Sequence, residues 1–123
     1  MIKLVYCVKQ RNDISPEEFH RYWLEEHRVL VKRLAITIRI RRYGQSHRIE
    51  TEMNDFFRLS KGTGEPYDVI TEIWWDSWDE LAAAGSPEGI EADKTLLEDE
   101  RKFVDHARSV VFLTEEHEIL ETQ

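Results

Sequence analysis

The sequence predicts a single α+β domain in which one antiparallel sheet is covered by helices on one face. Four short segments are rich in apolar residues, and most of them alternate in the period of two that is typical of a strand. Two Ser-Pro pairs, at residues 15–16 and 86–87, mark helix starts. Together these signals give the order strand, helix, strand, strand, helix, strand.

Length and composition limit the number of domains and the kinds of partner that are expected. The chain has 123 residues, which fits one domain over residues 1–123. Its net charge of −8 argues against nucleic acid and against an anionic membrane surface as partners. No apolar run reaches the ~20 residues of a membrane span, and the start has no signal-peptide layout, so a cytoplasmic location is expected. The single cysteine, Cys7, excludes an intramolecular disulfide and a cysteine zinc site.

The first strand and the first helix have clear signals. Residues 2–9 alternate, with the even positions all apolar. Ser15 can cap the following helix, Pro16 suits its first position, and Glu18 completes a capping box. Helical spacing to about residue 34 then places five side chains on one face: Phe19, Trp23, His27, Leu30 and Leu34.

The middle of the chain predicts two strands around a long loop. Alternation from Ile36 to His47 indicates a long second strand, with an irregularity near Gly44. Residues 50–66 are polar and contain Gly62, Gly64 and Pro66, which predicts a loop with room for a short helical turn at 54–59. Loops of this length are often pocket lids. Residues 67–75 form the third strand.

The last third of the sequence supplies the remaining helices and the fourth strand. Ser77 and Glu80 form a second capping box that opens a short helix to about residue 84. A further helix runs from Ser86 and Pro87 to about Val104, and residues 109–114 form the fourth strand. This split βαβ pair is the ferredoxin-like motif. Because Ile70, Trp74 and Trp75 are too apolar for an open sheet face, we expect a second copy to cover it in a two-fold homodimer with a barrel-like centre.

His27 is the sharpest single candidate for chemistry. It lies on the apolar side of the first helix, between Trp23 and Leu30. One interpretation is a core histidine that is hydrogen-bonded to backbone or to a carboxylate. The other is a general acid or base in a pocket, since the pKa of histidine is easily moved across neutrality.

A polar stripe on the second strand is the other candidate. Tyr43, Gln45 and His47 project from one strand face and place a phenol, an amide and an imidazole side by side. Such a stripe is normal for a solvated face. It also suits a pocket wall that orients a substrate oxygen or moves a proton.

Further candidates lie on the third strand. Glu72 is expected either to be an acid with a raised pKa or, as we favour, to pair with an arginine of the neighbouring strand. The tryptophans, among them Trp23 and Trp74, suit core and interface positions and would also fit a planar aromatic ligand. The sequence has no Gly-rich phosphate loop, no dinucleotide fingerprint and no metal-binding histidine spacing, so neither cofactor nor metal is predicted.

The chain resembles the EthD family of the dimeric α+β barrel superfamily nearly from end to end. The resemblance rests on motifs in a fixed order: residues 15–23 (SPEEFHRYW) followed by His27, residues 42–47 (RYGQSH), residues 72–77 (EIWWDS), residues 86–89 (SPEG), then 99–100, 103–105 and 115–117. It implies a ferredoxin-like fold and a homodimer. Family members often carry a glycine and a proline soon after that first histidine, whereas this chain has Arg28 and Val29, so its helix is expected to continue.

The resemblance also suggests site roles and two kinds of function. Relatives are linked to ether and lactone degradation and to aromatic polyketide cyclisation or dehydration. The family's helix-one histidine matches His27, and its strand-two tyrosine and histidine match Tyr43 and His47. We therefore expect a cofactor-independent enzyme acting by proton transfer on a small cyclic or aromatic compound, with Trp23, Gln45, Glu72 and Trp74 as substrate-binding residues. The alternative is a non-catalytic binding or accessory protein for an oxidative degradation pathway. A haem protein is a third option, because other branches of the superfamily bind haem.

Overall fold

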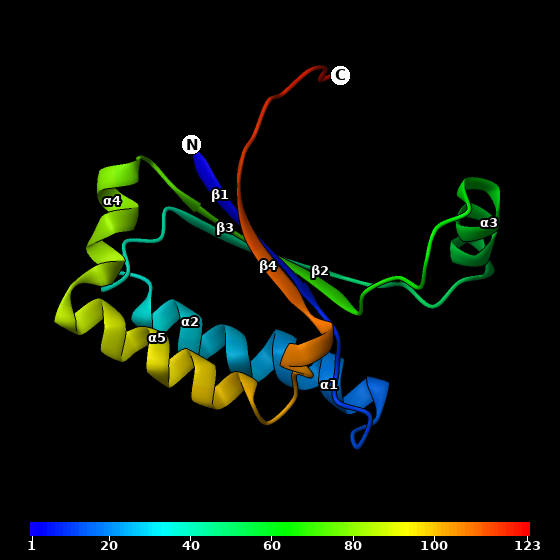
Figure 1. Cartoon of the computed structure of the whole chain (residues 1–123), viewed down its shortest axis with the longest axis horizontal. Coiled ribbons are helices and arrows are strands. Elements are labelled where there is room, and N and C mark those ends of the chain that lie inside the picture. Colours follow the sequence, from blue (N-terminus) through cyan, green and yellow to red (C-terminus); the bar gives the residue numbers. More distant parts are fainter.

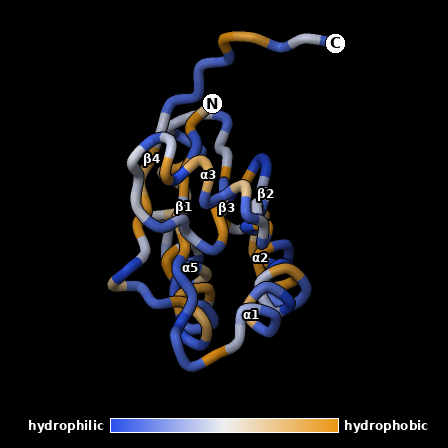
Figure 2. Tube along the Cα trace, turned by 90° about the vertical axis from the view of Figure 1, so that its right-hand side faces the viewer, coloured by the Kyte–Doolittle hydropathy of each residue, from blue (hydrophilic) through white to orange (hydrophobic).

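The computed structural model describes residues 1–123 and contains one four-stranded antiparallel sheet with helices on one side (Figure 1). The strands are β1 (Ile2–Val8), β2 (Arg42–His47), β3 (Val69–Trp75) and β4 (Val110–Glu115), in the order β2-β3-β1-β4. This is the ferredoxin-like topology that the element order predicts. Figure 2 shows hydrophobic residues along the central strands β1 and β3.

The first helix extends over residues 16–34 but is not a regular α-helix throughout. It consists of α1 (Pro16–Tyr22), a π-helical turn η1 (Trp23–His27) and α2 (Arg28–Leu34). Ser15 caps it by accepting from the backbone N–H of Glu18, while the Glu18 carboxylate pairs with Arg21 and does not close the predicted box. The wider π turn rotates the buried face, so Val31 is buried where regular spacing predicts Leu30.

The predicted strand start at Ile36 is wrong. The chain continues for one further turn beyond α2, because the N–H of Ile38 binds the carbonyl of Leu34 and the N–H of Ile40 binds that of Ala35. Arg39 takes a left-handed φ of 56°, which ends the helix. Apolar residues at every second position therefore reflect a helix terminus here, and β2 begins only at Arg42.

The second half contains three helices and two 3-10 turns. The predicted loop holds a ten-residue helix, α3 (Glu52–Lys61), which extends away from the rest of the molecule (Figure 1). Next come α4 (Trp78–Ala82), the 3-10 turn η2 (Ala83–Gly85) and α5 (Pro87–Glu100). The last helix ends four residues before the predicted Val104, and η3 (His106–Arg108) leads into β4. Ser77 and Ser86 cap α4 and α5 as expected.

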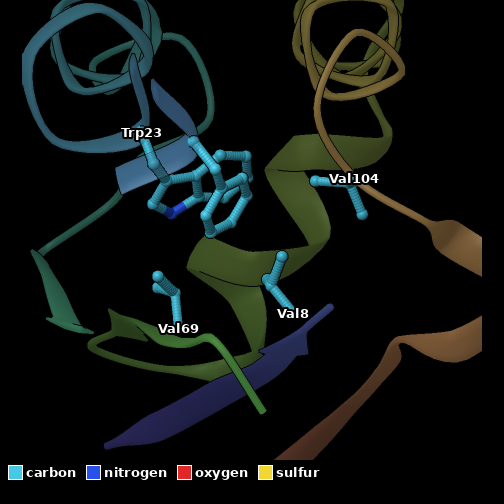
Figure 3. Packing of buried hydrophobic residues seen from close by; sticks show 5 residues of the cluster. Val8, Trp23, Val69 and Val104 are labelled. Carbon is cyan, nitrogen blue, oxygen red and sulfur yellow. The ribbon is translucent and has the colours of Figure 1, made fainter. Parts of the chain in front are cut away.

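The sheet has two distinct faces, fixed by the register of its strands. On β1 and β3, Val8 lies opposite Val69 and Tyr6 opposite Thr71, and both pairs face the helices. Figure 3 shows Trp23, Val8, Val69 and Val104 pointing toward one another at the end of the sheet nearest α1, where with Phe19 they form the buried core. Burying such side chains contributes roughly 1.5–3 kcal/mol each.

The opposite face carries Ile70, Glu72 and Trp74, and no helix covers it. The expectation that Trp75 lies on this open face is wrong, because Trp75 faces the helices and its indole N–H donates to the carbonyl of Ile38. Trp74 is only 6% exposed, because Lys3 and Arg42 lie over its ring and Glu116 accepts from its indole N–H. The argument that Trp74 needs a second chain to keep it from water is therefore wrong.

Candidate functional site

The π-helical turn buries His27 within the helix-facing layer. Its ring stacks on Trp23 with centroids 4.1 Å apart and planes 18° apart, and the residue is 3% exposed. Trp23 is held in turn by Thr71, whose hydroxyl accepts from the indole N–H at 3.1 Å. π-helical turns are rare and recur at functional sites. His27 is thus fixed from one side by a ring that is itself anchored to the sheet.

A carboxylate fixes the other side of His27. Nδ1 lies 2.8 Å from Oδ2 of Asp99, at the end of α5, and the hydroxyl of Tyr22 donates to Oδ1 of the same carboxylate. Burial alone would raise the pKa of Asp99, but the hydrogen bonds from Tyr22 and His27 and the nearby Lys102 hold it below its usual value. Because an ionised carboxylate can only accept, Nδ1 of His27 carries the proton.

The second ring nitrogen of His27 remains open. Among buried side-chain nitrogen and oxygen atoms, the one without a partner is Nε2 of His20. Nε2 of His27 also makes no hydrogen bond within the protein. Because it is not among the fully buried atoms without a partner, this nitrogen remains accessible to solvent. A histidine with Nδ1 bound to a carboxylate and Nε2 open is arranged to accept a proton from a ligand.

The polar stripe of β2 faces the helices, which excludes the alternative of a solvated sheet face. Tyr43, Gln45 and His47 lie opposite Ile73, Thr71 and Val69 on the helix-facing side. The amide nitrogen of Gln45 is 2.8 Å from the Tyr43 hydroxyl and 2.8 Å from the Trp23 carbonyl. This one amide therefore connects the strand to the π-helical turn that carries His27.

The hydrogen bonds continue from Gln45 to the helix. His47 Nε2 lies 2.7 Å from Oε1 of Gln45, and His47 Nδ1 lies 2.7 Å from Nδ1 of His20. Burial lowers the pKa of His20 and of His47, and each contributes a neutral imidazole near pH 7. Burial raises the pKa of Tyr43 to about 12, although the bond from Gln45 lowers it, so its phenol keeps its proton.

A cross-strand row beside Tyr43 is incompletely packed. Tyr43 pairs with Ile73, Ile73 with Leu4, and Leu4 with Leu113. These side chains face the helices, yet the first three are only half-buried and Leu113 is exposed. In the next row Tyr6, also half-buried, donates to Glu100 at 2.7 Å. The middle of the sheet thus offers an apolar floor with the Tyr43 hydroxyl at one end.

The sheet separates two of the predicted site residues from the other five. Trp23, His27, Tyr43, Gln45 and His47 lie together on the helix-facing side. Glu72 and Trp74 lie on the opposite face, so they cannot line the same site, because neighbouring residues of a strand point to opposite faces. Glu72 pairs with Lys3 of β1 at 2.8 Å and not with an arginine as predicted.

The expectation that His27 borders an internal cavity is not met in the isolated chain. Four surface pockets stand out, and none is lined by His27, Tyr43 or Gln45. The largest, about 540 Å³, lies between α3 and the end of the sheet and has a wholly polar lining. The row that begins at Tyr43 ends instead at β4, where Val111 and Leu113 are exposed.

Sequence reasoning missed three participants: His20, Tyr22 and Asp99. Their roles depend on partners that are distant in the chain: Asp99 comes from a helix 72 residues beyond His27, Tyr22 binds Asp99, and His20 contacts His47. The available signal is the family resemblance, whose motifs include residues 15–23 and 99–100. No group of three or more His, Cys, Asp or Glu side chains is arranged to hold a metal ion. All helices are too short or too polar to cross a membrane.

These features define a class: a ferredoxin-like α+β protein with a polar cluster between its helices and its sheet. The family model of the EthD domain matches residues 11–107, and the chain belongs to this family. No curated protein sequence matches it.

Solved structures share the fold. An EthD family protein from Bacillus halodurans C-125 aligns with a TM-score of 0.64 at 19% identity, covering 95% of this chain and 99% of the other. A dimeric ferredoxin-like protein of unknown function from Bacteroides fragilis gives 0.55 at 18% identity, covering 93% and 94%. SnoaB from Streptomyces nogalater, described as a cofactor-independent oxygenase, gives 0.53 at 13% identity, covering 98% and 97%.

Proposed function

We propose that this protein binds a small cyclic or aromatic carbonyl compound on the helix-facing side of the sheet and transfers a proton on it without a cofactor. The observation that carries the proposal is the open Nε2 of His27, held by Asp99 and Trp23 in the same layer as the Tyr43 phenol. The half-buried row of Leu4 and Ile73 supplies an apolar floor of the kind that small-molecule sites use.

The proposed chemistry uses one base and one hydrogen-bond donor. Nε2 of His27 takes a proton from the carbon next to the carbonyl, the electron pair of the broken C–H bond forms a carbon–carbon double bond, and the carbonyl π pair moves to the oxygen. The phenol of Tyr43 donates to that oxygen, and the carboxylate of Asp99 stabilises the imidazolium. Return of the proton from His27 to another carbon gives an isomer. Where the second carbon from the carbonyl carries a hydroxyl, the enolate pair returns through the carbon–carbon double bond, the C–O bond breaks, and the hydroxyl leaves as water with the proton from His27, which is dehydration.

The remaining predicted residues take supporting roles in this proposal. Trp23 forms a flat wall that stacks on His27, and Gln45 and His47 orient Tyr43. The description of SnoaB as cofactor-independent is consistent with chemistry carried by side chains alone. A cytoplasmic location fits the free thiol of Cys7.

We also propose that the protein is a homodimer. Two relatives with this fold are described as dimeric. Helix α3 has no buried residue, and its large apolar side chains are exposed: Met53 55%, Phe56 61%, Phe57 51% and Leu59 82%. β4 exposes a second apolar set, Val110, Val111, Phe112 and Leu113. Exposed apolar surface of this extent marks an interaction site.

A test of the catalytic role does not require the natural substrate. 2-Tetralone is a bicyclic aromatic ketone with acidic hydrogens beside its carbonyl. In D₂O, NMR would follow loss of these hydrogens with and without protein. We expect the protein to accelerate exchange and His27→Ala to reduce that acceleration ~10²-fold or more. His117→Ala, in the exposed tail, is the matched control and should exchange like the wild type.

The same experiment separates the proposed enzyme from the alternative, a non-catalytic binding or accessory protein for an oxidative pathway. The tight packing of His27 against Trp23, which leaves the histidine 3% exposed, favours that alternative. Binding of 2-tetralone by calorimetry without accelerated exchange would establish the accessory role. If His27→Ala exchanges as fast as the wild type, His27 is not the base.

A further inference from the structure

We infer that the Trp23 carbonyl, Gln45, His47 and His20 form one ordered hydrogen-bond chain that holds the Tyr43 hydroxyl as a free donor for a ligand oxygen. His20 enters the site as a positioning residue. The inference rests on the proposed function for the identity of the ligand oxygen, while the order of the chain follows from its own geometry.

The direction of the chain is fixed at its first member. A backbone carbonyl can only accept, so the atom of Gln45 that lies 2.8 Å from the Trp23 carbonyl is the amide nitrogen. The second hydrogen of that nitrogen points to the Tyr43 oxygen, also at 2.8 Å. Tyr43 therefore accepts a hydrogen bond from Gln45, and the hydrogen of its own hydroxyl has no acceptor in the protein. A half-buried phenol with an unused hydrogen is prepared to bind an oxygen atom of a ligand.

The same step fixes both histidine tautomers. With its nitrogen directed to Trp23, Gln45 presents Oε1 to His47, so Nε2 of His47 must carry a hydrogen. A neutral His47 then has a bare Nδ1, and the contact of 2.7 Å requires His20 to donate from Nδ1. Nε2 of His20 is left as a bare nitrogen, buried and without a partner. Each assignment follows from the previous one, and with both imidazoles neutral no other assignment satisfies all four contacts.

His20 thus acts on Tyr43 through two intermediates. Without its Nδ1 donor, His47 is free to adopt the other tautomer, which would face the Gln45 oxygen with a lone pair. The Gln45 amide would then lose its hydrogen bond from His47, and it would no longer be held in the position from which it binds Tyr43. The predicted consequence is a loss of hydrogen bonding to a ligand oxygen and not a loss of apolar packing.

Two probes of one shape isolate this effect. 2-Tetralone has the carbonyl oxygen, and tetralin is the same bicycle without it. Calorimetry should show the wild type binding 2-tetralone about fivefold more tightly than tetralin, the ratio that one neutral hydrogen bond supplies. Tyr43→Phe and His20→Leu should reduce the ratio to about one while tetralin binds as before. His20→Asn, whose amide keeps a donor near the Nδ1 position, should restore most of the preference.

The tautomers can be measured without any ligand. Long-range ¹⁵N–¹H spectra at pH 8 should show His47 protonated on Nε2 and His20 on Nδ1. The opposite tautomer of either histidine would refute the proposed hydrogen-bond chain. An unchanged ratio of 2-tetralone to tetralin affinity in His20→Leu would also refute it. If the tautomers are as stated but neither probe binds, the proposed function fails and the ordered chain stands. A variant that weakens both probes equally shows a structural role for His20 and contradicts the positioning role.

Discussion

At the scale of the residue, the carbonyl of Trp23 links the first helix to the sheet. It lies at the first position of the π-helical turn, and it accepts from a side chain of the neighbouring sheet. The turn also directs the rings of Trp23 and His27 to the same side. The irregular backbone of the π-helical turn and the hydrogen bond from Gln45 to the Trp23 carbonyl therefore occur at the same place in the helix.

The histidine pair predicts a pH dependence of stability. Burial lowers the pKa of His20 and of His47 below the unfolded value of 6.5, and for His20 the charge of Arg48 lowers it further while those of Asp68, Glu50 and Glu17 raise it. As the pH falls through about 6.5, the unfolded chain therefore takes up protons before the folded one does. The free energy of unfolding should fall from pH 7.5 toward pH 5, until the lower folded pKa values are reached.

Urea denaturation at several pH values measures this dependence. His20→Gln and His47→Gln should each lose part of the slope between pH 7.5 and 5. His117→Gln removes a histidine of the exposed tail and is the control. Variants whose stability curves run parallel to that of the wild type would contradict the assigned pKa directions.

The residues that sequence patterns could and could not identify differ in a physical way. His27, Tyr43, Gln45 and His47 stand out because local periodicity assigns them a face. Asp99 and His20 acquire their roles only from packing between segments that are distant in the chain. Glu72 and Trp74 were placed in the site because periodicity shows which residues share a strand face and not which face meets the helices.

At the scale of the element, the predicted helix starts are confirmed where a serine side chain caps the helix. Ser15, Ser77 and Ser86 accept hydrogen bonds at the starts of their helices, as their sequence contexts predict. The stretch 36–40 shows the opposite case. Three isoleucines at every second position favour a strand, but the preceding helix continues by one turn and a left-handed Arg39 ends it. Local pattern cannot separate these two states when the segment is this short.

The start of α5 gives a prediction at this scale. Gly89 approaches the backbone of the preceding 3-10 turn so closely that an added Cβ would lie 2.4 Å from the carbonyl oxygen of Ala84. Backbone cannot move aside as a flexible side chain can, so Gly89→Ala should destabilise the fold by about 1–3 kcal/mol. Gly64→Ala has open space around it and is the matched control. Equal thermal midpoints for both variants would show that this packing is looser than described.

At the scale of the whole molecule, the single chain leaves apolar surface uncovered in two places, helix α3 and strand β4. A ten-residue helix without buried residues is marginal in water, so α3 needs a surface to pack on. A second copy would supply that surface and would also cover the exposed apolar side chains of β4, among them Leu113. This places the proposed dimer and the proposed site in one structural argument.

Sedimentation tests the role of α3. The wild type should be dimeric at micromolar concentration, and the pair Phe56→Ser and Phe57→Ser should shift it toward monomer. Glu52→Gln changes the same helix without removing apolar surface and should leave the dimer intact. A monomeric wild type would refute the dimer, and a dimer that tolerates both serines would exclude α3 from the interface.

A crystal structure with 2-tetralone would show whether a ligand binds on the helix-facing side of the sheet. We expect the carbonyl oxygen about 2.8 Å from the hydroxyl of Tyr43, with the rings over Leu4 and Ile73 and the carbon beside the carbonyl facing Nε2 of His27. A ligand bound on the opposite face, beside Glu72 and Trp74, would contradict it.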